Sequence, residues 1–245
     1  MPAMTYGPDQ PGAGLIGYML NRERRAHTPP APQGAMFDYT LASDGLYINA
    51  RREDLEVCFP IALAEVRGLG ELFETFAFNL PHVPENLVEQ ILQISLEYAQ
   101  DSKESLFWLR HSPLNPYDDG WLLEQPAQTR SAASCRPHDG QEDLYDRVII
   151  EIHSHHGMRP EFSRTDDADE RGFRLYGVIG NLPEAPEIRL RVGVYGYFWE
   201  IPAAWALELP DGLADCNPDE GELDAYDRAE RMELRELESE EVEEP

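Results

Sequence analysis

Two histidines and an aspartate have the types and spacing of a metal site. A mostly apolar run from Val148 to Ile152 is typical of a buried strand and leads directly into His153 and His155. Because successive side chains of a strand point to opposite faces, the two imidazoles share one face. Asp166 follows eleven residues after His155 and offers a carboxylate oxygen. Two histidines and one carboxylate, with a fourth position left for water, predict a catalytic zinc site.

A purely structural interpretation of the same residues is also open. Ser163 has the residue type of a helix N-cap, and Asp166 stands at the third helical position, where it favours a helix start. A bare His-x-His pair occurs often by chance. The complete string H-x-H-x7-S-x2-D, placed between a buried strand and a helix start, is far more specific.

This string, formed by His153, His155, Ser163 and Asp166, resembles the signature of the JAMM (MPN-plus, JAB) zinc metalloprotease family, which removes ubiquitin and ubiquitin-like proteins from their conjugates. The resemblance implies that His153, His155 and Asp166 bind zinc and that Ser163 donates a hydrogen bond to the tetrahedral intermediate. One departure is His156, which stands where the family commonly has proline. His155 remains the expected ligand because the family spacing counts from it.

A zinc hydrolase also needs a base that takes a proton from water and passes it to the leaving amine. The resemblance places this base on the strand after a long helix, which indicates Glu104. Glu104 precedes His153 by 49 residues, so the sequence cannot show that they meet. Glu151 is the alternative, because it shares a strand face with His153 and His155.

The elements that must position these residues follow from hydrophobic periodicity. Apolar residues at helical spacing predict a scaffold helix over 85–100, with Pro84 suited to its first turn. Strands are expected over 104–110, 121–123, 145–155, 175–179 and 188–199, with 129–135 extending the same sheet and a short helix over 167–171.

The predicted fold class is α+β: an α/β/α-like, cytidine-deaminase-type JAB/MPN domain with a mixed sheet and flanking helices. Before it, an apolar patch over 15–20 has a weak strand signal, and an Asp-Gly turn predicts a hairpin between 37–41 and 46–48. The expected units are a flexible proline-rich segment (1–35), a small α+β module (36–82), the catalytic domain (83–210), and an acidic tail, disordered or helical (211–245).

Charge and cysteine content limit the binding partners and the cellular location that we expect for this protein. The formal net charge is −27, and 15 acidic but only 3 basic residues follow from Asp211 onward. This charge disfavours nucleic acid and anionic membranes as partners. Three widely separated cysteines indicate no disulfide framework, and no signal peptide or membrane-spanning run is visible. A cytoplasmic location is therefore expected.

The resulting functional expectation is a zinc-dependent peptidase or isopeptidase that cuts after the C-terminus of ubiquitin or a bacterial ubiquitin-like protein. The layout resembles the bacterial branch of the family, including PRTRC-system protein A and deconjugases of ubiquitin-like operons. The resemblance implies as partners a ubiquitin-like protein, its conjugates, and E1- and E2-like proteins of the same operon. A non-catalytic binding scaffold and a zinc hydrolase for another amide remain alternatives. The similar RadC-type motif is disfavoured because −27 opposes DNA binding.

Overall fold

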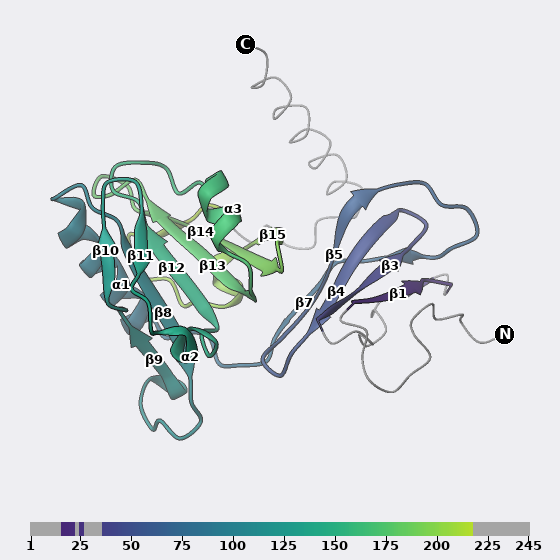
Figure 1. Ribbon diagram of the computed structural model, residues 1–245, viewed down its shortest axis with the longest axis horizontal. Coiled ribbons are helices and arrows are strands. Elements are labelled where there is room, and N and C mark those ends of the chain that lie inside the picture. Colours follow the sequence, from purple (N-terminus) through teal and green to yellow (C-terminus); the bar gives the residue numbers. More distant parts are fainter. Residues whose placement is uncertain (1–15, 23–24, 27–35, 218–245) are drawn as a thin grey trace, which may run out of the picture.

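A seven-stranded mixed sheet forms the larger part of the computed structural model, which describes residues 16–22, 25–26 and 36–217 (Figure 1). The strands follow the order β15-β14-β13-β12-β8-β9, and β16 pairs with β14 outside this path. They are β8 (Ser105–His111), β9 (Trp121–Glu124), β12 (Ile150–Ser154), β13 (Phe173–Gly180), β14 (Glu187–Val194), β15 (Tyr197–Ile201) and β16 (Ala214–Asp215). The β12–β13 and β14–β16 pairs are parallel and the others antiparallel.

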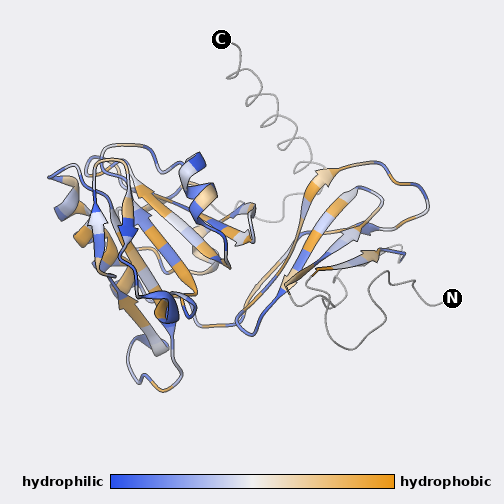
Figure 2. Cartoon of the chain, in the orientation of Figure 1, coloured by the Kyte–Doolittle hydropathy of each residue, from blue (hydrophilic) through white to orange (hydrophobic). Residues whose placement is uncertain are grey.

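Strand alternation gives this sheet two different faces, visible as alternating hydropathy along the strands in Figure 2. One face enters the main hydrophobic core together with the predicted scaffold helix, α1 (Glu85–Ala99). The residues that meet there are Leu87, Ile91, Phe107, Leu109, Ile150 and Ile152. The opposite face carries His153 and Glu151, and it lies under a separate hairpin, β10 (Gln128–Arg130) and β11 (Cys135–Pro137). Two short helices also flank this face, α2 (Glu142–Tyr145) and α3 (Arg164–Asp169).

The second sheet precedes α1 and has the order β1-β3-β4-β5-β7. Its strands are β1 (Ile16–Leu20), β3 (Phe37–Leu41), β4 (Gly45–Arg51), β5 (Leu55–Leu63) and β7 (Thr75–Phe78), and β2 (Arg25–Ala26) pairs with β6 (Glu71–Leu72) beside it. The predicted hairpin and the strand near residue 16 are confirmed.

The expectation of an α+β module is wrong, because the elements over 36–82 in the structure are all strands. The apolar segment from Leu55 forms β5, where burial is greatest for the aromatic and aliphatic residues of its first half. Most of the proline-rich segment 1–35 lies outside the described residues.

Aromatic side chains join the two sheets. Phe59 of β5 stacks on Trp199 of β15, with ring centroids 5.6 Å apart, and Phe76 approaches Trp205 at 5.4 Å. Arg52 also donates a hydrogen bond to the carbonyl of Phe173. These contacts make one continuous core from both sheets.

Three predicted strands differ from the observed ones. The segment 129–135 does not extend the central sheet but contributes to the separate β10–β11 hairpin. The strand expected over 145–155 spans only Ile150–Ser154, because the residues up to Tyr145 form α2. The strand expected over 188–199 is two strands, separated by a tight turn at Tyr195 and Gly196, both with positive φ.

The end of the described chain packs on the central sheet. Leu213 is 5% exposed and belongs to the main core, and β16 adds to β14. The predicted acidic tail therefore begins with anchored residues, while 218–245 lie outside the described part. Within the described residues, no helix has the length and apolar character required to cross a lipid bilayer.

Candidate metal centre and active site

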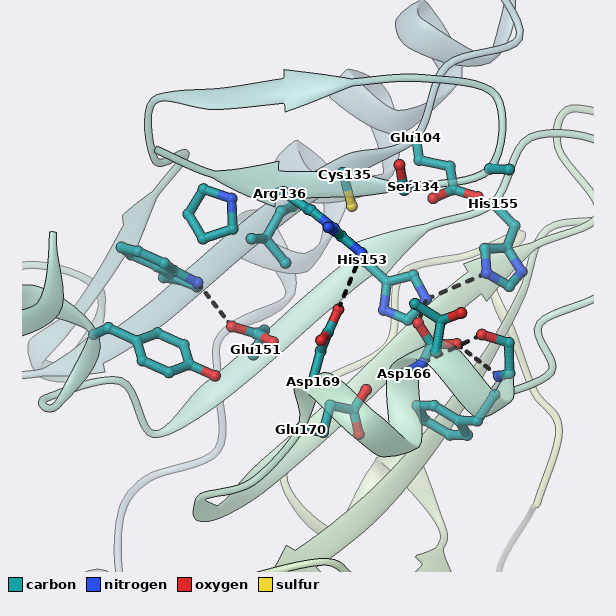
Figure 3. A pocket seen from close by; sticks show the side chains of 18 of the residues that line it. Glu104, Ser134, Cys135, Arg136, Glu151, His153, His155, Asp166, Asp169 and Glu170 are labelled. Carbon is teal, nitrogen blue, oxygen red and sulfur yellow. Dashed lines mark hydrogen bonds and ion pairs between the residues drawn. The ribbon is translucent and has the colours of Figure 1, made fainter. Parts of the chain in front are cut away.

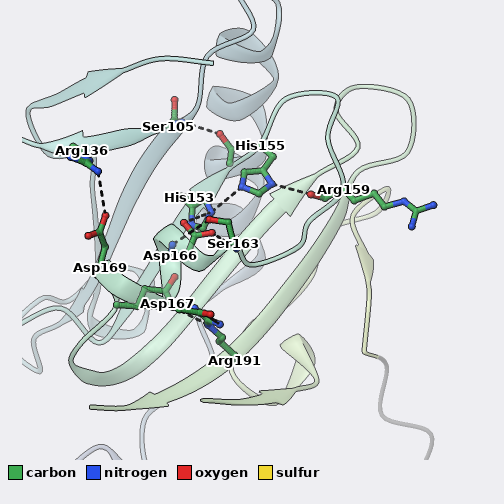
Figure 4. A network of polar contacts seen from close by, with 12 residues as sticks. Ser105, Arg136, His153, His155, Arg159, Ser163, Asp166, Asp167, Asp169 and Arg191 are labelled. Atoms are coloured by element: carbon green, nitrogen blue, oxygen red, sulfur yellow. Dashed lines mark hydrogen bonds and ion pairs between the residues drawn. The ribbon is translucent and has the colours of Figure 1, made fainter. Parts of the chain in front are cut away.

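His153, His155 and Asp166 converge on one point at the end of β12 (Figures 3 and 4). One potential ligand atom from each lies within 4.8 Å of the other two. The Nε2 atoms of the two histidines are 3.2 Å apart, and His153 Nε2 is 3.8 Å from Asp166 Oδ1. The histidines are 7% and 9% exposed, so this group lies at the base of a cavity rather than on an open surface.

The donor set fits a divalent metal ion. Two imidazoles on one tetrahedral zinc, with Zn–N of about 2.0–2.1 Å, would have nitrogens ~3.3 Å apart. His155 Nδ1 lies 2.9 Å from the carbonyl oxygen of Arg159, which can only accept, so Nδ1 carries the proton and Nε2 presents its lone pair. Burial lowers the pKa of His153 from 6.5 to about 4, although Asp166 opposes this change. His153 can therefore act as a neutral ligand, and the Nε2 atom of His155 faces the same point.

Asp166 serves the helix and the candidate metal centre at the same time. Its Oδ2 accepts a hydrogen bond from the backbone N–H of Ser163 (2.6 Å), and its own N–H donates to Ser163 Oγ (3.3 Å). This reciprocal capping box starts α3. The structural interpretation of these residues is thus confirmed, and Oδ1 still faces His153. Ser163 accepts through its hydroxyl oxygen, which leaves the hydroxyl proton available for donation.

Sheet register brings Glu104 to the same place. In the antiparallel β8–β12 pair, Ser105 lies opposite Ser154 and Leu106 opposite His153. One further step places Glu104 opposite His155, on the same face. Glu104 is 4% exposed and lines the cavity. Burial raises the pKa of Glu104, His155 acts in the opposite direction, and Asp166 raises it further.

Glu151 shares this face but lies at the other end of the cavity (Figure 3). Its register partner is Trp108, whose Nε1 donates a 2.9 Å hydrogen bond to Glu151 Oε2. The charges that act on Glu151 include Arg174 and Asp169, whereas those acting on Glu104 are His155 and Asp166. Of the two candidate bases, Glu104 is therefore the one placed beside the histidines.

Arg191, which the sequence-based interpretation missed, holds α3 against the sheet. Its guanidinium lies between the rings of Phe162 and Phe198, at 3.8 and 3.7 Å from their centroids. It donates to Glu170 Oε2 (2.9 and 2.7 Å) and to Asp167 Oδ1 (2.7 Å). The sequence does contain a signal for this contact. Arg191 lies inside a predicted buried strand, downstream of an acidic helix.

The cavity has a volume of about 930 Å³ and extends from the histidines along β12. Residues of β11 form one wall, and residues around α3 form the opposite one. His156, the departure from the family pattern, has its Nε2 3.0 Å from the carbonyl oxygen of Ala132 in the β10–β11 turn. It therefore contacts the hairpin rather than the three converging donors.

Comparison with known families agrees with this geometry. Residues 87–193 match a family model described as prokaryotic homologs of the JAB domain. The match runs from α1 through β14 and contains the three donors, Glu104 and Ser163. It supports a bacterial JAB/MPN-type domain in this part of the chain. A search of curated proteins gave no match.

Proposed function

We propose that this protein is a zinc-dependent peptidase or isopeptidase that cleaves the bond following the C-terminus of a ubiquitin-like protein. The observation that carries the proposal is the convergence of His153, His155 and Asp166, with Glu104 beside them at one end of a long cavity. The match to prokaryotic JAB homologs supports the same reaction class. A scaffold role is less favoured because the complete donor set is present and correctly oriented.

The roles of the residues follow from their chemistry. A zinc ion held by His153, His155 and Asp166 would supply Lewis acidity and make water nucleophilic near neutral pH. Glu104 accepts the proton of the attacking water and delivers it to the leaving amine, a role that its raised pKa suits. Ser163 donates its hydroxyl proton in a hydrogen bond to the oxyanion of the substrate.

The β10–β11 hairpin provides a binding place for an extended substrate. β11 lines the cavity, and among the described residues its pairing partner is β10, which leaves its other edge open. A flexible C-terminal tail added as a strand would satisfy its backbone groups there and reach the histidines. A folded loop could not enter in this way. The tail of a ubiquitin-like protein is therefore the substrate that we expect.

Zinc content and cleavage test this proposal together. Fusions of ubiquitin and of bacterial ubiquitin-like proteins would be incubated with the zinc-loaded protein, with and without a chelator. We expect chelator-sensitive cleavage at the end of the ubiquitin-like part. Glu104→Gln should keep one zinc per chain and lower kcat by about 10² to 10⁴, because it removes proton transfer but no ligand.

The His153→Ala/His155→Ala double variant serves as the metal-free control. It should lose zinc, as measured by elemental analysis, while circular dichroism shows that the fold is kept. One equivalent of zinc retained by this variant would contradict the ligand assignment. Cleavage of an unrelated amide, with every ubiquitin-like fusion left intact, would remove the protein from the deconjugase class.

A further inference from the structure

His155 is oriented by a backbone carbonyl (Figure 4). Its Nδ1 lies 2.9 Å from the carbonyl oxygen of Arg159, and its Nε2 lies 3.2 Å from Nε2 of His153. In a neutral imidazole either nitrogen can carry the proton. Because a carbonyl oxygen can only accept, it holds this proton on Nδ1 and leaves the lone pair of Nε2 for a metal ion. The tautomer of His155 therefore depends on where the chain places the Arg159 carbonyl.

The backbone that carries this carbonyl lies against the end of β13. Gly180 is the last residue of this strand. A Cβ atom at this position would lie too close to three backbone atoms, namely Met158 O (2.5 Å), Pro160 N (2.5 Å) and the carbonyl carbon of Arg159 (2.7 Å). Non-bonded carbon atoms normally stay about 3.5–4.0 Å apart. Since all three are main-chain atoms, no side-chain rotation could relieve these contacts, and the close approach requires glycine.

Hydrogen bonds hold the same segment on both sides of Arg159. The backbone N–H of Asn181 donates to Met158 O at 2.7 Å. Arg189 of β14 donates from Nε to Pro160 O at 3.0 Å. A shift that made room for a side chain at position 180 would lengthen these bonds and move the Arg159 carbonyl away from His155.

Two neighbouring glycines do not have this requirement. A Cβ atom at Gly157, in the same loop, would have its nearest neighbour 3.7 Å away, which is an ordinary contact. A Cβ atom at Gly177, in the same strand, would meet side-chain atoms of Ile152 and Leu190, the nearest at 3.1 Å. Of these three glycines, Gly180 alone is pressed against the backbone that orients His155.

We propose that Gly180 is a positioning residue of the candidate metal centre, whose missing side chain lets the Arg159 carbonyl reach His155 and select the tautomer that binds a metal ion. Arg189 assists by holding the next carbonyl along the chain. This inference rests on the proposed function, because the tautomer of His155 affects the reaction only when zinc occupies the site. Gly180 contacts neither zinc nor substrate and acts through His155.

Nuclear magnetic resonance of the metal-free protein reads the tautomer directly. Isotope-labelled histidine in mildly alkaline buffer, where a free imidazole is neutral, gives distinct signals for protonated and unprotonated ring nitrogens. The signals that disappear in a His155→Gln variant belong to His155. We expect the wild-type protein to carry the His155 proton on Nδ1. Gly180→Ala should lose this single tautomer and show signals of both forms.

Zinc affinity, measured by competition with a chromophoric chelator, gives a second readout. Gly180→Ala should bind zinc about 10- to 100-fold more weakly, the range for changes around a metal ligand. Gly157→Ala is the control in the same loop and should change neither the tautomer nor the affinity. Gly177→Ala should crowd the core and lower the urea midpoint, again with the wild-type tautomer and affinity. This comparison separates positioning from a general loss of stability.

Arg189→Met provides the test should Gly180→Ala fail to fold. It removes the donor to Pro160 O and should shift the tautomer in the same direction, with zinc affinity lowered by about 2- to 10-fold, as expected for one hydrogen bond. Glu200→Gln is its matched control, because it removes the 2.7 Å ion pair with Arg189 Nη1 and leaves Nε on Pro160. It should keep the wild-type tautomer.

A folded Gly180→Ala protein with the wild-type tautomer and zinc affinity would overturn the proposal, as would a wild-type His155 protonated on Nε2. If Gly180→Ala does not fold, an unchanged tautomer in Arg189→Met has the same consequence. The tautomer is read without metal or substrate, so it decides this inference even when the wild-type protein cleaves no fusion. Conversely, chelator-sensitive cleavage by Gly180→Ala at the wild-type rate supports the proposed reaction and rejects the role of Gly180.

Discussion

Asp166 divides its two carboxylate oxygens between two tasks. Oδ2 closes the capping box with Ser163, and Oδ1 faces His153. The hydrogen bond at Oδ2 fixes the direction of Oδ1, as outer-shell partners do for metal ligands. The same residue pair therefore starts a helix and orients a candidate ligand, so the structural and the metal-binding interpretations of this motif are not exclusive.

Substitutions at Ser163 can separate these two tasks. Ser163→Ala removes both the cap acceptor and the hydroxyl donor. It should lower the free energy of unfolding by about 0.5 to 2 kcal/mol, as the loss of a cap does. It should also lower kcat by roughly 10² to 10³ while changing KM little, if the hydroxyl stabilises the oxyanion.

Ser163→Thr is the control, because it retains both a cap oxygen and a hydroxyl donor. Urea unfolding and steady-state kinetics of both variants measure the two effects. A Ser163→Ala enzyme with wild-type kcat would assign Ser163 to helix capping alone.

At the level of elements, α3 depends on its surroundings. A helix of six residues is too short to be stable by itself. Its start is fixed by the capping box, and Arg191 on β14 holds Asp167 and Glu170. Since Asp166 belongs to this helix, a loosened α3 would move a candidate ligand away from the histidines.

We therefore expect Arg191→Lys to weaken zinc binding by about 10- to 100-fold, the range seen when outer-shell partners are changed. Lysine keeps the charge but loses the stacking between Phe162 and Phe198 and the paired hydrogen bonds to Glu170. Competition with a chromophoric chelator measures the affinity. Arg110→Lys, which alters the Arg110–Glu124 pair in the same sheet, should leave the affinity unchanged.

The sequence allowed α1, the strand before the histidines and the convergence of the three candidate donors to be predicted, because each depends on periodicity or short-range spacing. The position of Glu104 could not be derived in this way. Glu104 reaches His155, which lies 51 residues further along the chain, through the register of β8 on β12, and tertiary packing fixes this register. The hydrogen bond from Trp108 to Glu151 depends on the same register.

At the scale of the whole molecule, aromatic contacts join the all-β N-terminal part to the central seven-stranded sheet. Phe59 is 1% exposed and stacks on Trp199, so its ring belongs to the core of both parts. The N-terminal sheet should therefore unfold together with the central sheet and not as an independent unit.

Phe59→Ala should lower the free energy of unfolding by about 3 to 5 kcal/mol, the usual cost of a phenylalanine removed from a core. Tryptophan fluorescence and far-ultraviolet circular dichroism should still report one coincident transition. Leu63→Ala at the end of the same strand, where Leu63 is 48% exposed, is the control and should change stability by less than about 0.5 kcal/mol. Two separate transitions in the wild-type protein would show that the sheets fold independently.

The C-terminal end offers a second test at this scale, because the boundary of the packed chain lies beyond the position expected from composition. Leu213 is buried in the core, Ala214 donates a backbone hydrogen bond to Pro186, and Cys216 donates one to Ile188.

The residues after Asn217 comprise 13 acids and only 3 bases, and they contain none of the candidate catalytic residues. A chain ending at Asn217 should therefore keep its fold and cleave within a few-fold of the full-length rate. A chain ending at Gly212 should lose about 1.5 to 3 kcal/mol through Leu213 alone, besides the β16 hydrogen bonds. Thermal unfolding and cleavage rates of the two truncations provide the comparison. Unfolding of the chain that ends at Asn217 would show that the acidic segment contributes to the stability of the domain. Equal stability of the two shortened chains would contradict the role assigned to Leu213.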